Sequence, residues 1–283
     1  MKTEMSENSV EKKDFYLNTF SQNEIAQCMQ TKWAGKKIVF FEETGSTNME
    51  AMRLAFEGYP HGTLVLADSQ TGGKGRRGRS WHTPKGSSVA MSFILKPELE
   101  AEYASMLTLV QAMAVAKVIE ENCGLKAQIK WPNDIVVNNK KVCGILTEMY
   151  PDADGKYFVI VGCGINVGQK EIPDDLQGVA TSLFLESNVV LSAEELLRGV
   201  LAEFEQYYDR FLQNETLETF ADEYNTWLIS CDKEVRVLDP KGEFAGISKG
   251  INDKGELLVQ LADGSITEVY AGEVSVRGLY GYV

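Results

Sequence analysis

Residues of the kinds that build metal centres or disulfide frameworks are few in this sequence. Its 283 residues include two histidines and five cysteines, and no two cysteines are spaced as C-x-x-C. Structural zinc sites and thiol redox pairs use such short spacings. We therefore expect free thiols in a reducing cytoplasm and no structural zinc.

Positive charge is also scarce, with 28 lysine and arginine residues against 41 aspartate and glutamate residues and a net charge of -13. Affinity for a nucleic acid scales with the phosphates that lysine and arginine neutralise, so this composition argues against extensive DNA binding and leaves room only for a local basic site. The first residues, MKTEMSENSVEKKDFY, lack an apolar run, which argues against a signal peptide or a membrane span there. We expect a cytoplasmic protein without a membrane partner.

The chain is long enough for one large domain and a small one. Residues 1–34 are predicted to form a polar tail and a short helix around residues 21–30. For residues 35–230, apolar periodicity predicts strands at 36–43, 63–70, 87–95, 127–131, 134–138, 141–149 and 156–168, and helices at 47–58, 103–124 and 192–213. Residues 231–283 carry short β-rich runs between turns, which predict a small barrel.

Two of these helices carry start and stop signals. Thr47 and Glu50 have the spacing of a capping box, and Gly58 follows as a stop. Ser192 and Glu195 form a second box of the same kind. Residues 169–188 have no periodicity and are predicted to be a loop.

The most unusual stretch is TGGKGRRGRSW at residues 71–81, which directly follows a predicted buried strand. Four glycines keep a loop mobile, and four cations repel one another, so an anion is expected to hold it. Its GKGRRG matches G-x-G-x-x-G, but Pro84 and Gly86 prevent the helix that a dinucleotide site needs, and the G-K-[ST] of a phosphate loop is missing. The alternative is a solvated basic loop.

A second stretch, KWPNDIVVNNKKVCGILTEM, covers residues 130–149. Pro132 disfavours a helical Trp131, which places Asn133 and Asp134 on a turn and aims both polar groups at one spot. Lys141 begins the return strand after a turn at 138–139. A surface ion pair between Asp134 and Lys141 is the alternative reading.

The third stretch is GCGIN at residues 162–166, where small residues at the end of an apolar strand allow a ligand or another backbone to come close. A tight strand end is the alternative. His61 and His82 have no partner motif and are expected to be loop residues. Cys143 and Cys163 are expected to be small apolar fillers.

Taken together, the order and spacing of these motifs resemble the catalytic domain of biotin protein ligases. The shared motifs are STN (46–48), QTGGKGRRGRSW (70–81), KWPNDI (130–135) followed by a lysine and GIL-x-E, and GxGIN (162–166). The final GEVSVRG (272–278) resembles the end of their SH3-like C-terminal domain. The resemblance covers residues 35–283 and implies an α+β fold: a mixed sheet flanked by helices, of the class II synthetase-like biotin and lipoate ligase type, with a small SH3-like β barrel. It implies a catalytic domain at 35–230 and the SH3-like domain at 231–283.

The resemblance implies an ATP-dependent biotin-[acetyl-CoA-carboxylase] ligase. Such enzymes join biotin to ATP, release pyrophosphate, and pass biotin from biotinyl-5'-AMP to one lysine of a biotin carboxyl carrier domain of an acyl-CoA carboxylase. ATP and Mg2+ are the expected cofactors. A carboxylate and a polyphosphate meet only where cations neutralise them, so the basic loop is expected to close over both substrates as a lid.

Residue roles follow from the same resemblance. Lys141 and Arg76 match the catalytic positions. Biotin would be bound by Ser46, Thr47, Asn48, Gln70, Gly73, Lys74, Arg76, Trp81, Lys141, Gly144 and Gly164. ATP would be bound by Arg76, Arg77, Arg79, Asn133, Asp134, Asn166 and Arg277. No protein ligand for a metal is assigned, because Mg2+ arrives with ATP, with Asp134 as one candidate contact.

Two departures from the family pattern bear on function. Lys74 stands where the family usually has arginine. About 35 residues precede the first catalytic strand, too few for a winged helix-turn-helix, so neither repressor activity nor specific DNA binding is expected. The alternatives are a lipoyl or octanoyl ligase, which shares the fold, and a DNA-binding regulator, which would need a recognition helix. A homodimer through the sheet is left open.

Overall fold

The computed structural model describes residues 30–152, 155–187, 192–272 and 274–278. The expected N-terminal tail, and all but the last residue of the short helix expected around residues 21–30, lie outside them.

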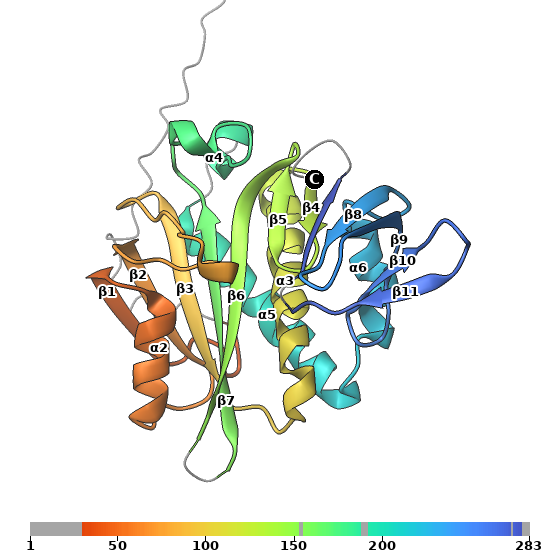
Figure 1. Ribbon diagram of the computed structural model, residues 1–283. Coiled ribbons are helices and arrows are strands. Elements are labelled where there is room, and N and C mark those ends of the chain that lie inside the picture. Colours follow the sequence, from red (N-terminus) through yellow and green to blue (C-terminus); the bar gives the residue numbers. More distant parts are fainter. Residues whose placement is uncertain (1–29, 153–154, 188–191, 273, 279–283) are drawn as a thin grey trace, which may run out of the picture.

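A seven-stranded mixed sheet forms the larger part of the molecule, in the order β1-β2-β3-β7-β6-β5-β4 (Figure 1). β1 pairs with β2 in parallel and every other pair is antiparallel. The strands are β1 (Ile38–Thr44), β2 (Thr63–Gln70), β3 (Ser88–Leu95), β4 (Ala127–Lys130), β5 (Asp134–Val137), β6 (Lys140–Pro151) and β7 (Tyr157–Asn166). All seven correspond to strands predicted from periodicity.

Helices cover both faces of this sheet. α3 (Leu107–Cys123) and α5 (Ala193–Asn214) pack on one face and build the main core, and α2 (Thr47–Phe56) covers the other beside β2, β3 and β7. The segment Ala101–Cys123 is long and apolar enough to cross a membrane by length and composition alone. It is mostly buried inside the protein, as a core helix is.

Local signals explain most helix ends, with one correction. Gly124 ends α3 in the left-handed conformation, and Ser192 and Glu195 form the predicted capping box at the start of α5. The box predicted at Thr47 and Glu50 is wrong, because Ser46 is the N-cap and makes no side-chain capping bond. The Thr47 hydroxyl instead points into the interior, where buried polar partners lie.

A five-stranded antiparallel sheet forms the second part of the chain, in the order β11-β10-β9-β8-β12. Its strands are β8 (Glu234–Leu238), β9 (Phe244–Ile251), β10 (Leu257–Gln260), β11 (Ile266–Val269) and β12 (Ser275–Gly278). The α+β class with an antiparallel C-terminal domain is therefore confirmed. Within the described residues no ladder joins β11 to β12, so the sheet is open along that edge.

Short helices connect these elements, and two α-helices were not predicted. They are α4 (Leu183–Glu186), inside the predicted loop, and α6 (Ala221–Trp227), which leads into the second sheet. The 3-10 turns are η2 (Arg76–Gly78), η3 (Ala101–Met106), η4 (Asp174–Leu176) and η5 (Glu218–Phe220). None is long enough to give a clear period of 3.6.

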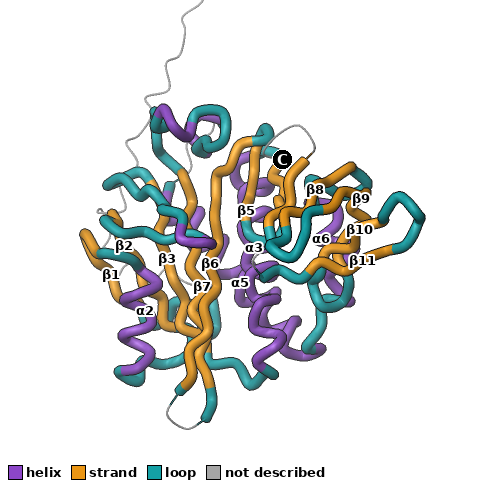
Figure 2. The backbone as a smooth tube through the Cα atoms, in the orientation of Figure 1, coloured by secondary structure: helices purple, strands orange, loops and turns teal. Residues whose placement is uncertain are grey.

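The second sheet lies beyond the β5–β4 end of the first (Figure 2). Trp131 Nε1 donates to the carbonyl of Gly255 across this junction (3.0 Å), and Leu217 N donates to Asp253 O (2.7 Å). These contacts anchor the turn between β9 and β10 to the larger part of the molecule.

Candidate active site

The three stretches singled out in the sequence line one cavity of about 630 Å³. The start of α2, the basic loop, the β4–β5–β6 hairpins and the end of β7 all contribute to its wall. Residues 169–180 and 274–276 complete it. Segments far apart in the sequence thus meet at one end of the large sheet, next to the second sheet.

One end of the cavity is neutral and rich in hydrogen bonds. The backbone N–H and the hydroxyl of Thr47 donate to Gln70 Oε1 (2.8 and 3.2 Å), and Gln70 Nε2 donates to Thr83 Oγ1 (2.9 Å). Ser46 and Thr47 are buried at the beginning of α2. Hydroxyl and amide groups held in this way suit a neutral ligand that carries both donors and acceptors.

Asn48 lies at the same end of the cavity, but its side-chain amide makes hydrogen bonds to other groups of the protein. Its Nδ2 donates to Leu146 O (3.2 Å) and Glu148 Oε2 (2.7 Å), and its Oδ1 lies 2.6 Å from Ser92 Oγ. A Cβ atom at Gly162 would approach Asn48 Oδ1 to 1.9 Å, so the glycine creates the slot for this amide. Direct contact of Asn48 with a ligand stays a prediction.

Trp81 lies flat against two glycines that face the cavity. A Cβ at Gly164 would come within 2.3 Å of Trp81 Nε1, and one at Gly144 within 3.0 Å of Lys141 Nζ and 3.1 Å of Trp81. Lys141 Nζ lies 5.2 Å from the centre of the Trp81 ring. Both glycines therefore make room for the indole and the lysine, and their expected contact with biotin stays a prediction. Trp81 Nε1 is buried and has no hydrogen-bond partner within the described structure, so it offers a donor to a ligand.

The basic loop folds into a compact hairpin over the cavity. Trp81 N donates to Gly73 O (2.8 Å), and Gly75 N donates to Arg79 O (2.7 Å). A Cβ at Gly73 would lie 2.5 Å from the carbonyl oxygen of Trp81, so only glycine fits there. Lys74 Nζ points to Met49 Sδ (3.6 Å) at the rim.

Arg76 joins this loop to the second sheet. Its guanidinium donates to Asn133 Oδ1 (3.0 Å) and to the carbonyls of Ala271 (3.0 Å), Gly272 (2.5 Å) and Val274 (3.5 Å). Burial lowers the pKa of Arg76 from its usual value, although Asp134 opposes the shift. All of these hydrogen-bond partners are neutral, so an anionic ligand would be a stronger partner for this cation.

Lys141 and Asp134 form an ion pair inside the cavity, with Nζ 2.6 Å from Oδ1. Their side chains are 22% and 11% exposed, so the alternative reading as a surface pair is wrong. The backbone of Lys141 is held by Val179 O (2.8 Å), which adds residues 179–181 to the edge of this hairpin. A lysine fixed on a strand in this way has a defined position relative to whatever the cavity binds.

Lys130 is a cavity residue that sequence reasoning missed. It ends β4 opposite Asp134 of β5. Burial lowers its pKa to about 8, with Asp134 opposing the shift and Lys141, Arg277 and Arg79 adding to it. The available signal was a lysine at the end of a half-buried strand, directly before the Trp-Pro-Asn-Asp turn.

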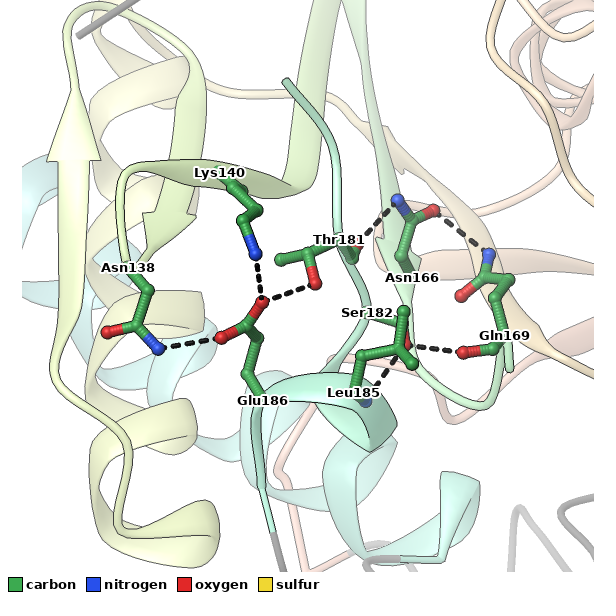
Figure 3. A network of polar contacts seen from close by, with 8 residues as sticks. All are labelled: Asn138, Lys140, Asn166, Gln169, Thr181, Ser182, Leu185 and Glu186. Atoms are coloured by element: carbon green, nitrogen blue, oxygen red, sulfur yellow. Dashed lines mark hydrogen bonds and ion pairs between the residues drawn. The ribbon is translucent and has the colours of Figure 1, made fainter. Parts of the chain in front are cut away.

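Asn166 ends β7 and holds the wall of the cavity through a polar network (Figure 3). Its Nδ2 donates to Thr181 O (3.0 Å), and its Oδ1 accepts from Gln169 Nε2 (3.1 Å). Ser182 Oγ donates to Gln169 O (2.6 Å) in the same network. The predicted contact of Asn166 with the adenosine stays a prediction, and its observed role is to position residues 169–182.

The same network reaches the turn between β5 and β6 through Glu186 of α4 (Figure 3). Asn138, Lys140 and Thr181 all donate to its carboxylate (2.6, 3.1 and 2.6 Å). Burial raises the pKa of Glu186, but these hydrogen bonds outweigh it and leave the pKa below its usual value. An anion thus anchors α4 to the hairpin that carries Lys141.

Comparison with known proteins agrees with this geometry. Residues 40–166 match the Biotin/lipoate A/B protein ligase family, and residues 230–277 match the Biotin protein ligase C terminal domain. The Bifunctional ligase/repressor BirA of Bacillus subtilis is 35% identical over 258 residues, covering 90% of this chain and 79% of that protein. The chain belongs to the biotin protein ligase family.

Two further relatives, one compared by sequence and one by structure, also match most of the chain. The biotin--[acetyl-CoA-carboxylase] ligase of Paracoccus denitrificans is 34% identical over 230 residues, covering 77% of this chain and 91% of that protein. The structure of the biotin protein ligase from Aquifex aeolicus in complex with biotin and ATP superposes with a TM-score of 0.75 at 31% identity, covering 86% and 99% of the two chains. The lipoyl alternative is disfavoured, because residues 230–277 match the Biotin protein ligase C terminal domain.

The remaining predicted site residues and the two histidines differ in where they lie relative to the cavity. Arg77 and Arg79 line it, whereas Arg277 is exposed on β12 and acts on Lys130 through its charge. His82 lines the rim, and His61 Nδ1 accepts from Lys96 N (3.0 Å) away from the cavity.

Cys143 and Cys163 lie side by side in the main core, with their sulfurs 3.5 Å apart. Burial raises the pKa of the Cys143 thiol, which agrees with a role as an apolar filler.

Among the described residues, no group of three or more histidine, cysteine, aspartate or glutamate side chains could hold a metal ion. A single buried carboxylate, Asp134, beside the neutral amide oxygen of Asn133, fits a Mg2+ ion that keeps waters and arrives on ATP phosphates better than it fits a resident metal.

Proposed function

We propose that this protein is an ATP-dependent biotin protein ligase that forms biotinyl-5'-AMP and then transfers biotin to a lysine of a biotin carboxyl carrier domain. The observation that carries the proposal is the division of one cavity into a neutral hydrogen-bonding end and a cationic end that holds Arg76 and Lys141. Biotin has the matching parts: a neutral ureido ring at one end and a carboxylate at the other.

In the first step a carboxylate oxygen of biotin attacks the α-phosphorus of ATP, and the bond to the β-phosphate oxygen breaks as pyrophosphate leaves. Lys141 and Arg76 neutralise the charge of the two approaching anions, and Lys141, held by the β5–β6 hairpin, faces the charge that grows in the transition state. Mg2+ would be held by ATP together with Asp134 and Asn133 and would offset phosphate charge.

In the second step the neutral amine of the acceptor lysine attacks the acyl carbon of biotinyl-5'-AMP. A C–N bond forms, the acyl C–O bond to phosphate breaks, AMP leaves, and the amine proton passes to solvent. Arg76 retains the adenylate between the two steps, because its loop covers the cavity and its guanidinium lies beside Asn133.

The acceptor is proposed to be the carrier domain of an acetyl-CoA carboxylase, which rests on the name of the Paracoccus denitrificans relative. A cytoplasmic location agrees with the free thiols of the described cysteines.

The deciding experiment incubates the protein with ATP, Mg2+ and biotin and follows pyrophosphate release and biotinyl-5'-AMP by mass spectrometry. Pyrophosphate should appear with biotin and remain at background with lipoate. Adding a carrier domain should then label one lysine. Background release with biotin as well would overturn the proposal.

We also propose that the chain does not bind an operator. The net charge of -13 and the use of the basic loop to close the cavity both disfavour a DNA contact. A gel shift at low salt with carboxylase or biotin-synthesis promoter DNA should give only weak, sequence-independent binding. A biotin-dependent specific complex that survives on the order of 0.2 M salt would contradict this.

A further inference from the structure

A continuous chain of side-chain contacts runs behind the neutral end of the cavity. It begins at Glu148 of β6, which contacts Asn48 of α2. Ser92 of β3 joins Asn48 to Thr47, and Thr47 contacts Gln70 of β2. Thr47, Asn48 and Gln70 line the cavity, whereas Glu148 and Ser92 do not. Because every partner must be either a donor or an acceptor, the chain has a direction that can be worked out from its fixed end.

Glu148 fixes the first member. A carboxylate and a backbone carbonyl only accept, and Asn48 has Glu148 Oε2 at 2.7 Å and Leu146 O at 3.2 Å on one side. The nitrogen of the Asn48 amide must therefore face them, and its oxygen faces Ser92. The reversed amide would set two acceptors 2.7 Å apart in a buried site, which is strongly unfavourable.

Ser92 passes this orientation on. Its Oγ lies 2.6 Å from Asn48 Oδ1 and 2.8 Å from Thr47 Oγ1, and it has one proton. An amide oxygen only accepts, so the proton of Ser92 lies toward Asn48. Thr47 then donates within the protein, to Gln70 Oε1 at 3.2 Å or to Ser92, and shows the cavity a lone pair.

Gln70 is oriented by the backbone of Thr47, and it presents a donor to the cavity where Thr47 presents an acceptor. Its Oε1 accepts the backbone N–H of Thr47 at 2.8 Å, so its nitrogen faces the other way and donates to Thr83 Oγ1 at 2.9 Å. These contacts use one hydrogen of Nε2 and leave the second for the cavity. The lining thus presents an acceptor on Thr47 beside a donor on Gln70.

We propose that Glu148 and Ser92 are positioning residues that make the Thr47 hydroxyl a hydrogen-bond acceptor for an N–H of a ureido ligand, beside the donor on Gln70 that faces the neighbouring C=O. The inference rests on the proposed function, since it takes biotin as the ligand. Neither residue touches the ligand. Both act by making the Thr47 hydroxyl an acceptor before the ligand arrives, whereas Gln70 is oriented independently by the backbone N–H of Thr47.

The test compares the binding of biotin with that of an N-methylated biotin, in which a methyl group replaces the hydrogen of a ureido N–H and removes the donor that Thr47 would accept. Wild-type protein should prefer biotin. Glu148→Gln keeps the shape but offers Asn48 either an oxygen or a nitrogen, so the direction of the chain is no longer imposed. We expect biotin affinity to fall roughly 3- to 10-fold and the preference for biotin over its N-methylated analogue to narrow by a similar factor, with kcat and the KM for ATP within about twofold of wild type.

Two further variants keep the result interpretable. Ser92→Ala interrupts the same chain at another residue and should also narrow the preference for biotin. It replaces Glu148→Gln in the test if thermal melting shows that Glu148→Gln is unfolded. Glu57→Gln makes the same chemical change at the exposed C-cap of α2, where Glu57 pairs with Arg53, and should leave both affinities unchanged.

The outcomes separate the inference from the proposed function. If wild-type protein binds biotin and both variants lose affinity for the two ligands equally, or not at all, the role in polarity is overturned while the ligase function stands. If wild-type protein does not bind biotin, the proposed function fails and the inference fails with it.

Discussion

The two ends of the cavity solve different recognition problems with different kinds of contact. At the neutral end, buried hydroxyls and amides bond to one another in a fixed order, as Thr47 does with Gln70. At the cationic end, Arg76 donates hydrogen bonds to carbonyl oxygens and Lys141 forms an ion pair with Asp134. Directional bonds select a ligand by shape and polarity, whereas charges tolerate displacement and gain strength from any anion that arrives.

The difference teaches how one cavity serves both selection and catalysis. The neutral end is set before the ligand arrives and contributes equally to the ground state and the transition state, so its loss should appear in KM. The cationic end meets charged groups. The loss of Lys141, which faces charge that grows in the transition state, should appear in the rate of adenylation, whereas the loss of Arg76 or of the charge on Lys130 should appear in the binding of the adenylate or of ATP. The predictions below test this division from the largest expected effect to the smallest.

Lys141→Ala should have the largest effect, because Lys141 is fixed on a strand beside the reacting groups. We expect adenylation in a single turnover to slow by roughly 100-fold or more, while biotin affinity changes far less. Adenylation at the wild-type rate would show that the rate-determining charge is supplied elsewhere, with Lys74 of the basic loop as the first position to examine.

Arg76→Ala should mainly affect retention of the intermediate. The variant loses the contacts that tie the loop to Asn133 and to residues 271–274, and it loses the cation facing the phosphate. We expect biotinyl-5'-AMP to dissociate roughly tenfold faster or more, and to label bystander proteins slowly. Adenylate off-rates measure the effect directly, with exposed Arg53→Ala as the matched control, and an unchanged off-rate would argue against the lid.

Lys130 should make ATP binding depend on pH. With its pKa lowered to about 8, the side chain is charged below that pH and loses its charge as the pH rises through 8. ATP affinity should therefore fall roughly 3- to 10-fold between about pH 7 and pH 9, on the scale of one charge-assisted contact. Lys130→Arg, which stays charged, should bind ATP with little change over this range. An equally steep decline in that variant would assign the effect to another group.

Lys74→Ala should have the smallest effect. Its Nζ lies at the rim beside Met49 Sδ, and a point charge cannot make the two-pronged contact of an arginine. Adenylation and biotin affinity should stay within about two- to threefold of wild type. Lys74→Arg shows whether the arginine usual in the family adds anything, and abolished activity in Lys74→Ala would reverse the order proposed for the cationic end.

Apolar patterns and the order of the motifs predicted most of the large sheet and much of the candidate site. Short, nearly continuous apolar runs predict the central strands because both faces of the large sheet are covered by helices, so residues that point to either face are buried. The cations of the loop and the Asn133-Asp134 turn indicate an anion site from chemistry alone. Short elements such as α4 and α6 escaped prediction, because helices of four and seven residues draw their stability from packing rather than from a period.

The sequence by itself determined the kinds of chemistry in this protein: a basic glycine-rich loop, a lysine seven residues after an aspartate, and motifs in the order that the biotin protein ligase family shares. Only the tertiary structure decided which partners those groups meet. Thr47 looks like a helix cap in the sequence, but the fold turns its hydroxyl toward Gln70 and Ser92 because buried polar groups must pair. Lys130 looks like an ordinary strand lysine, but the fold buries it beside Asp134 and near Lys141, Arg277 and Arg79. Burial and nearby charge, rather than residue type, therefore determine its pKa.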